Sequence, residues 1–137
     1  MNLWLIPGAN EEAYRNLPKT MAKPISEERL QKAGLDEAGS EYYAWGTRKG
    51  KNEVNVGKWQ NMQPDDVRLF YTQDLSGGER AYHWVAKIVD TVRSPKLSSA
   101  FWNDPEFELV YFLDKPKEIN ISVQSLSKAF SRYRENY

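Results

Sequence analysis

Residues 80–92 constrain the fold more than any other stretch of the chain, because they read as one long strand with apolar residues on both sides. One side carries an alternating apolar set, Tyr82, Trp84, Ala86 and Ile88. Val85 and Val89 add apolar side chains to the opposite side. A strand that is apolar on much of both faces needs cover on each of them. We therefore expect a closed or strongly curved sheet.

The other patterns in the sequence predict a mixed order of strands and helices, with strands in the majority. Short apolar or alternating runs predict strands at residues 2–6, 42–45, 67–72 and 106–113. Helices are predicted where a capping hydroxyl precedes a run of helix formers. Ser26 begins one that stops at Gly34, and Ser94 with Pro95 begins another over residues 96–102. The predicted fold class is therefore α+β.

A final helix is predicted over residues 122–136. Val123, Leu126, Phe130 and Tyr133 recur there at steps of three and four residues. This spacing places the four side chains on one face of the helix. We expect that face to cover the sheet.

Length and composition set further bounds. The 137 residues suit one domain over residues 1–137, and no repeat or linker divides the chain. Cysteine is absent, which excludes disulfides, thiolate metal sites and cysteine nucleophiles. No apolar run approaches the roughly 18 residues that span a bilayer, and the N-terminus lacks the basic region and length of a signal peptide. We expect a soluble, cytoplasmic protein without a membrane partner.

The sequence gives little support to enzymatic chemistry. The single histidine, His83, lies in a strand-like run with no nucleophile turn and no metal-ligand spacing around it. Asp65 and Asp66 follow Pro64 and precede a strand, which favours a role in the turn over general acid and base catalysis. We therefore predict no catalytic residue, no cofactor and no metal site.

The charge balance bears on nucleic-acid binding. Basic and acidic residues number nineteen each, so the chain lacks the overall attraction that a sequence-blind DNA-binding protein has for nucleic acid. Four cationic residues nevertheless fall close together, Arg48, Lys49, Lys51 and Lys58. We interpret them as phosphate contacts on one basic face. The alternative is a surface loop that is polar because water surrounds it.

Aromatic residues are the second sign of a binding site. Five tryptophans and eight tyrosines exceed what a core of aliphatic residues needs, and aromatic faces are the surfaces on which proteins stack nucleobases. Trp4 and Trp84 lie in apolar strands and are predicted to be structural. Trp45 ends a strand directly before a glycine-rich cationic loop, and Trp102 ends a short helix. We expect these two to stand open to a ligand, whereas Trp59 fits either role.

Three stretches, taken in order, resemble the EVE and YTH domains of the PUA-like superfamily. The first, at residues 3–10, reads LWLIPGAN. The second runs from YAWGTR at 43–48 through Asn52 and Trp59 to MQPDDVRLFY at 62–71. The third runs from HWVAKIV at 83–89, through Ser94-Pro95 and Phe101-Trp102, to FELVYFL at 107–113. Together they span nearly the whole chain.

The resemblance implies a curved barrel of five or six strands flanked by short helices. YTH domains hold 6-methyladenine of RNA in an aromatic cage. Similar domains begin Mcr-type modification-dependent restriction proteins, where they read methylated DNA ahead of a GTP-driven AAA+ motor. The implied function is a non-catalytic reader that binds one flipped, methylated base of DNA, either 6-methyladenine or a modified cytosine. A chain that starts at Met1 and stops after one domain suits a fragment of such a protein.

Carried over position by position, the resemblance also assigns base contacts. It makes Trp45 the cage wall at the strand end, with Thr47 beside it, and Trp102 a second wall. Asn10, in the first turn, is placed to bond a ring nitrogen of the base. Asn52 and Trp59 complete the implied base-binding set.

Two alternatives stay open. One is an RNA-binding PUA-like module that recognises a modified or unpaired RNA base. The other is a hydrolase of a small molecule or nucleotide on the same fold. A hydrolase needs a carboxylate or His83 beside a partner that positions water, and the sequence offers no such pair.

Overall fold

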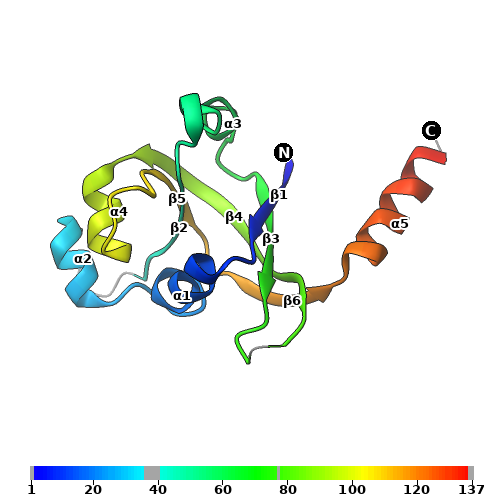
Figure 1. Cartoon of the computed structure of the whole chain (residues 1–137), viewed down its shortest axis with the longest axis horizontal. Helices are drawn as coiled ribbons and strands as arrows, with labels where there is room; N and C mark the ends of the chain where they lie inside the picture. The colour runs from blue at the N-terminus through cyan, green and yellow to red at the C-terminus, as the bar shows by residue number, and fades with distance from the viewer. Residues whose placement is uncertain (1, 36–40, 77, 136–137) are drawn as a thin grey trace.

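The computed structural model describes residues 2–35, 41–76 and 78–135. Within these ranges the chain forms six strands and five α-helices, which confirms an α+β protein. The strands build one curved sheet, and α1, α2 and α4 lie against it (Figure 1). In this part of the chain no helix is long and apolar enough to cross a membrane.

The sheet follows the strand order β1-β3-β4-β5-β2, and β6 pairs with β4 beside this path. Its strands are β1 (Leu3–Gly8), β2 (Tyr43–Thr47), β3 (Val67–Gln73), β4 (Arg80–Arg93), β5 (Leu109–Leu113) and β6 (Lys117–Ile121). β1 runs parallel to β3, and the other pairs are antiparallel. Among the described strands β1 and β2, which end the path, do not pair with each other, so the sheet is not closed into a barrel.

The long strand β4 is where the sheet bends. Its first half pairs with β3 and β6, and from Ile88 onward it pairs with β5. A register shift between Ile88 and Asp90 lies where the partner changes, and such bulges increase the local twist. The alternating set that begins at Tyr82 is buried as predicted, but Val89 on the other side is 56% exposed. The outer face of β4 is therefore covered only in part.

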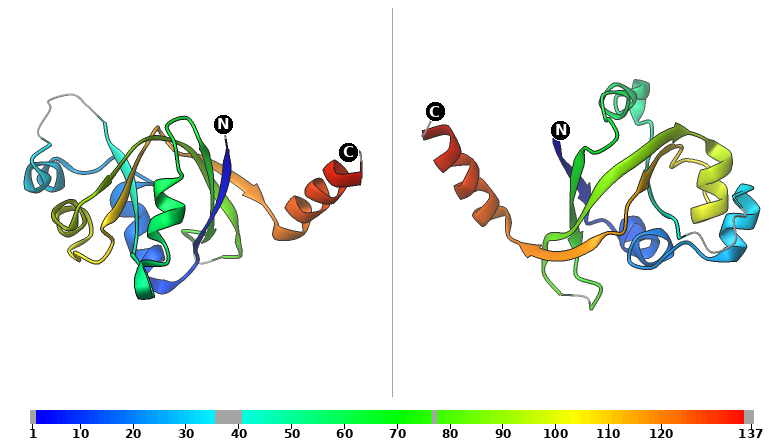
Figure 2. Two further views of the ribbon diagram at one scale, coloured as in Figure 1. Left: turned by 90° about the horizontal axis from the view of Figure 1, so that it is seen from above. Right: turned by 180° about the vertical axis from the view of Figure 1, so that it is seen from behind.

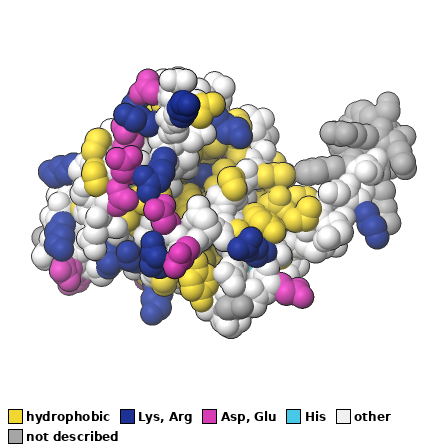
Figure 3. All heavy atoms as spheres, in the orientation of Figure 1, with side chains coloured by type: hydrophobic (Ala, Val, Ile, Leu, Met, Phe, Trp, Pro, Cys, Tyr) yellow, Lys and Arg dark blue, Asp and Glu magenta, His cyan; other side chains and the backbone are white. Residues whose placement is uncertain are grey.

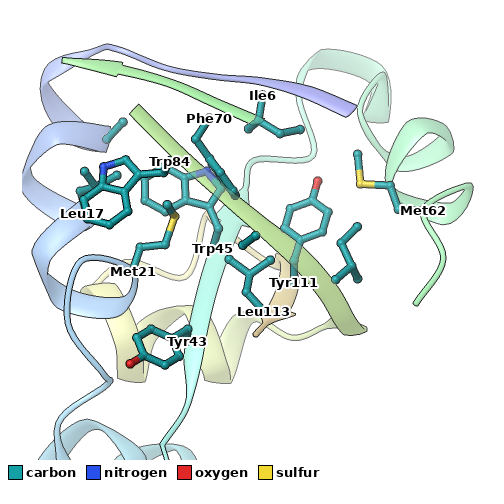
Figure 4. Close-up of a cluster of buried hydrophobic side chains, with 13 residues drawn as sticks. Ile6, Leu17, Met21, Tyr43, Trp45, Met62, Phe70, Trp84, Tyr111 and Leu113 are labelled. Atoms are coloured by element: carbon teal, nitrogen blue, oxygen red, sulfur yellow. The ribbon is translucent and has the colours of Figure 1, made fainter. Parts of the chain in front are cut away.

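Two cores lie on the two faces of the β2–β5 pair. The inner core fills the concave side of the sheet with Trp45, Phe70, Trp84 and Tyr111, and α1 (Glu11–Thr20) closes it with residues such as Leu17 (Figure 4). The outer core packs the opposite faces of β2 and β5 against α2 (Glu27–Ala33) and α4 (Pro95–Trp102). β2 is thus covered on both sides at Tyr43, Ala44 and Trp45, which are buried, whereas Gly46 and Thr47 are half-buried.

The predicted capping residues begin and end their helices as expected. The Ser26 hydroxyl accepts a hydrogen bond from the Arg29 backbone N–H, and Gly34 ends α2 with a φ of 76°. Such a positive φ is readily adopted by glycine, which has no Cβ. Ser94 caps α4 by accepting from the backbone N–H of Leu97.

Several elements were not predicted. Helix α1 carries Pro18 inside it, and proline normally interrupts a helix. The segment expected to be an irregular loop after β2 instead contains a 3-10 turn, η1 (Lys51–Glu53), and α3 (Val56–Gln60). The short strand β6 was also missed, because its residues are only half-buried or exposed and show little apolar alternation.

The expectation that the last helix covers the sheet is wrong. α5 (Val123–Glu135) extends away from the sheet and the other helices in both figures that show the whole chain (Figures 1 and 2). Its first residue, Val123, is 43% exposed. The side chains of Phe130 and Tyr133, and Asn136 at the predicted end, lie outside the described part of the structure. An amphipathic pattern shows that a helix has an apolar face, but not which surface that face meets.

The Asp66 side chain connects the first strand to the turn before β3. Asp66 directly follows that turn, which was predicted from the sequence. Its carboxylate accepts hydrogen bonds from the Asn2 backbone N–H at 2.9 Å, the Trp4 indole at 2.9 Å and the Gln63 backbone N–H at 3.0 Å. These bonds, that from Gln63 first, lower the pKa of the Asp66 carboxyl. Hydrogen bonds to the charged form favour ionisation.

We predict that Asp66 makes the protein sensitive to acid. Its folded pKa lies below the unfolded value of about 3.9, so its stabilisation is present above that pH and is lost as the pH falls through the folded pKa. Asp66→Asn should lower the melting temperature at pH 7 and show a smaller further drop toward pH 3 than the wild type. Thermal unfolding at a series of pH values measures this, with the exposed neighbour variant Asp65→Asn as control.

Candidate functional site

A cavity of about 180 Å³ lies beside Trp45, where the two end strands of the sheet approach each other without pairing. Pro7 of β1, Thr47 of β2 and Trp102 of α4 are among the residues that line it. An apolar cavity of about 150 Å³ is large enough to bind benzene, and pockets for larger ligands occupy roughly 300–1,000 Å³. The volume therefore suits one flat ring system.

The structure brings four of the six predicted base-binding residues to this cavity. Asn10, Trp45, Thr47 and Trp102 all line it. They come from three separate parts of the chain, the turn before α1, the end of β2 and the end of α4. Their convergence could not follow from their spacing in the sequence, because it depends on how α1 and α4 pack against β2.

Trp45 is anchored in the inner core rather than standing free. Its side chain is 5% exposed and meets the Phe70 ring edge-on, with the ring centroids 5.9 Å apart. The expectation that Trp45 and Trp102 present open faces therefore needs correction, because only part of each indole borders the cavity. The opening beside Trp45 nevertheless exists, so an indole wall is available to a ligand.

Trp102 is held from two sides. Its indole N–H donates to the Thr20 hydroxyl at 3.1 Å, and the side chain is 4% exposed. The backbone of Gly46 packs directly against the Trp102 ring. A Cβ at position 46 would come within 2.5 Å of the ring atom Cζ3. Glycine at position 46 is thus required for β2 and the indole to approach this closely.

Arg48 forms part of the cavity wall, but its charge is engaged by carboxylates. One guanidinium nitrogen lies 3.0 Å from both carboxylate oxygens of Glu12. Asp104 and Glu106 each approach within 3.5 Å, and the guanidinium lies 4.6 Å from the centre of the Phe107 ring. The hydrogen bonds that Arg48 donates to the Glu12 carboxylate raise the pKa of Arg48. Three acids around one base give this side of the rim a negative balance.

The other predicted residues lie outside the cavity wall. Lys49, Lys51 and Lys58 are exposed, and their role in phosphate binding stays a prediction. Asn52 is exposed in η1 with a left-handed φ of 56°. Trp59 is half-buried and donates its indole N–H to the Val110 carbonyl at 3.3 Å.

The predicted basic face is not uniform. On the face shown in Figure 3, basic and acidic side chains are interspersed over much of the surface.

Sequence reasoning missed several residues of the cavity. Glu12 and Asn16 come from α1, Asn55 from the turn after η1 and Phe107 from the segment before β5. A signal for α1 was present, because Asn10 precedes two acids and its side-chain oxygen accepts from the Ala13 backbone N–H at 2.8 Å. Asn55 donates its side-chain amide to the Arg48 carbonyl at 2.9 Å, which fixes the loop that follows β2.

His83 lies away from this cavity. It is half-buried on β4, and its Nε2 is 2.8 Å from the Glu79 carbonyl oxygen. In the described part of the chain no three histidine, aspartate or glutamate side chains are grouped so as to hold a metal ion.

The chain was compared with known protein families and with curated proteins, and neither comparison gave a match. The similarity to EVE and YTH domains therefore stands on the quoted residues alone.

We predict that Gly46→Ala destabilises the protein and disturbs the cavity. The added methyl group overlaps the Trp102 ring, and overpacking of this kind costs about 1–3 kcal/mol. Thermal or urea unfolding measures the loss, and a shift in tryptophan fluorescence should accompany it. Gly57→Ala is the matched control, because a Cβ there meets no described atom within 4 Å and alanine favours a helix. Equal stability of the two variants would contradict the close approach.

Proposed function

We propose that this protein is a non-catalytic reader that binds one flipped, methylated base of DNA, 6-methyladenine or a modified cytosine, in the cavity between Trp45 and Trp102. The observation that carries the proposal is the cavity itself. It has room for a single flat ring system and is bordered by two indoles and by polar side chains. In this proposal the reader directs a modification-dependent restriction system, with a GTP-driven AAA+ motor as its partner.

The lining suits an uncharged heterocycle. Trp45 and Trp102 offer aromatic surface for stacking or edge contacts. Pro7 and Ala13 supply apolar surface against which a methyl group of the base can pack. A filled methyl niche contributes selectivity of about 1–3 kcal/mol. Thr47 and Asn10 supply polar groups, and in the described structure the Asn10 amide nitrogen has no partner, since only its oxygen caps α1.

The position of the cavity supports a PUA-like fold of the EVE and YTH type as part of the same proposal. β1 and β2 form the two ends of a curved sheet, and α1 lies between them. The cavity opens where these strands approach each other. A base that leaves a duplex can therefore enter from the surface without any strand having to separate.

Phosphate contacts in this proposal come from lysines rather than from Arg48. Arg48 is already paired with Glu12, whereas Lys49, Lys51 and Lys58 are exposed on the adjoining turn and helix. Extrusion of a base costs a few kcal/mol of stacking and pairing energy. Stacking in the cavity and the lysine contacts together offset that cost.

The central test is a fluorescence-anisotropy titration with duplexes that differ only in one methylated base. We expect the protein to bind the methylated duplex more tightly than the unmodified one. Trp45→Phe should weaken binding of the methylated duplex about three- to tenfold, because the smaller ring keeps part of an aromatic contact that is worth about 1–3 kcal/mol when it is removed by alanine. Trp84→Phe is the matched control, since Trp84 is buried in the same core but does not line the cavity.

The outcomes of this titration separate the candidate functions. Equal affinity for the two duplexes, or equal effects of the two tryptophan variants, contradicts the proposal. Preference for a methylated single-stranded RNA over both duplexes would favour the RNA-binding alternative. Melting temperatures of both variants show whether the fold is retained.

A second prediction concerns salt. Replacing Lys49 and Lys51 together by glutamine should weaken binding of methylated and unmodified duplexes by the same factor. The slope of log K against log salt should fall by about 2, since each phosphate contact contributes about 0.9. The matched control replaces Lys87 and Lys117, which are exposed on β4 and β6 away from the cavity. A change in methyl preference with an unchanged slope would contradict a phosphate-binding role.

A further inference from the structure

Arg68 is a charged residue buried inside the molecule, and the proposed function gives it no role. Its side chain is completely buried, and none of its three guanidinium nitrogens has a hydrogen-bond partner among the described residues. Burial lowers the pKa of Arg68 to about 10, which leaves it protonated at neutral pH. A buried cation without a carboxylate is costly, so its surroundings must compensate for lost hydration.

Two aromatic rings provide that compensation. The guanidinium carbon lies 3.4 Å from the centre of the Tyr111 ring and 5.0 Å from the centre of the Phe70 ring. Attraction between a cation and the face of an aromatic ring is strongest where water is excluded. The closer contact is with Tyr111, whose hydroxyl contacts Thr47 in the cavity wall.

Tyr111 connects Arg68 to a residue that lines the cavity. Tyr111 pairs with Trp45 across β5 and β2, and its hydroxyl lies 3.3 Å from the Thr47 hydroxyl oxygen. A phenol is a stronger donor and a weaker acceptor than an aliphatic alcohol. This difference makes Tyr111 the donor and Thr47 the acceptor. The contact of the guanidinium with the ring holds the phenol in place.

The bond from Tyr111 leaves the Thr47 hydroxyl its proton and one lone pair. A hydroxyl group carries one proton and two acceptor lone pairs. Since the bond from Tyr111 occupies a lone pair, the proton of Thr47 is not needed for it. No other hydrogen bond to this hydroxyl exists among the described residues, and Thr47 lines the cavity.

We propose that Arg68 and Tyr111 are positioning residues that hold the Thr47 hydroxyl and leave its proton available to the cavity, so that the cavity favours a base with an acceptor, a ring nitrogen or carbonyl oxygen, at the edge facing Thr47. This inference rests on the proposed base-binding function and adds a chemical rule for the ligand. Indole walls alone accept any flat ring, whereas the Thr47 proton adds a hydrogen bond only to a base that carries an acceptor at that edge.

The test uses the methylated duplex and a matched duplex in which a nonpolar aromatic isostere replaces the methylated base. The isostere keeps the ring outline but has no strong acceptor. Thr47→Val should reduce the preference for the base over the isostere about five- to tenfold, the value of one neutral hydrogen bond. Thr47→Ser, which keeps the hydroxyl, should retain the wild-type preference.

The relay is tested by variants that leave Thr47 in place. Tyr111→Phe keeps the ring against Arg68 but removes the hydroxyl, and Arg68→Met removes the cation. Each should lower the preference for the base in the Thr47 protein by about two- to fivefold. Neither should change it further in the Thr47→Val background, because the donor is already absent there. A merely structural role would lower affinity for both duplexes equally and would act in both backgrounds.

The possible results separate this inference from the proposed function. If the wild type binds the methylated duplex and Thr47→Val keeps the preference for the base, the donor role is wrong while the reader function stands. If the Thr47 effects appear but Tyr111→Phe and Arg68→Met have none, the relay is wrong. If the wild type binds the methylated duplex no more tightly than the unmodified duplex, the proposed function fails. The donor rule then fails with it.

Discussion

The packing of β2 between two cores is the constraint on which the rest of the structure depends. Trp45 faces the concave core and Gly46 faces the outer core, where the Trp102 ring occupies the space that a side chain would need. Because neighbouring residues of a strand point to opposite faces, one short segment holds both indoles that border the cavity. The cavity is therefore a product of the main packing of the protein, and its walls cannot move without disturbing both cores.

Two arginines show how charge is distributed around this site. Arg48 lies in the cavity wall and is matched by Glu12, Asp104 and Glu106, while Arg68 is buried in the core against aromatic rings. Neither presents a free cation to the interior of the cavity. This arrangement fits the proposed neutral heterocycle better than a phosphate or another anion. In the proposed function, recognition of the base and attraction of the nucleic-acid backbone therefore belong to different residues.

The sequence predicted local features well and long-range packing poorly. The helix signals at Ser26, Gly34 and Ser94 were correct, because capping depends on a few adjacent residues. The helix α1 was missed, since Pro18 lies inside it and its stability comes from packing on the concave core. Of the cavity residues, Trp45 and Trp102 were predicted from their places at the end of a strand and of a helix, whereas Thr47 and Asn10 were predicted only through a family resemblance. Glu12 and Phe107 had no local signal that marked them as neighbours of Arg48.

Walls built from core residues also determine how selective the site can be. A preformed cavity requires little ordering when a ligand binds, so the main cost is extrusion of the base from its stack. The methyl niche and one directed hydrogen bond together give modest discrimination, since each contributes about 1–3 kcal/mol or less. In the proposed function, a reader that serves a restriction system must ignore a large excess of unmodified DNA. Under that proposal, selectivity on this scale requires several readers on one DNA, where tethering multiplies small preferences without any new contact in the cavity.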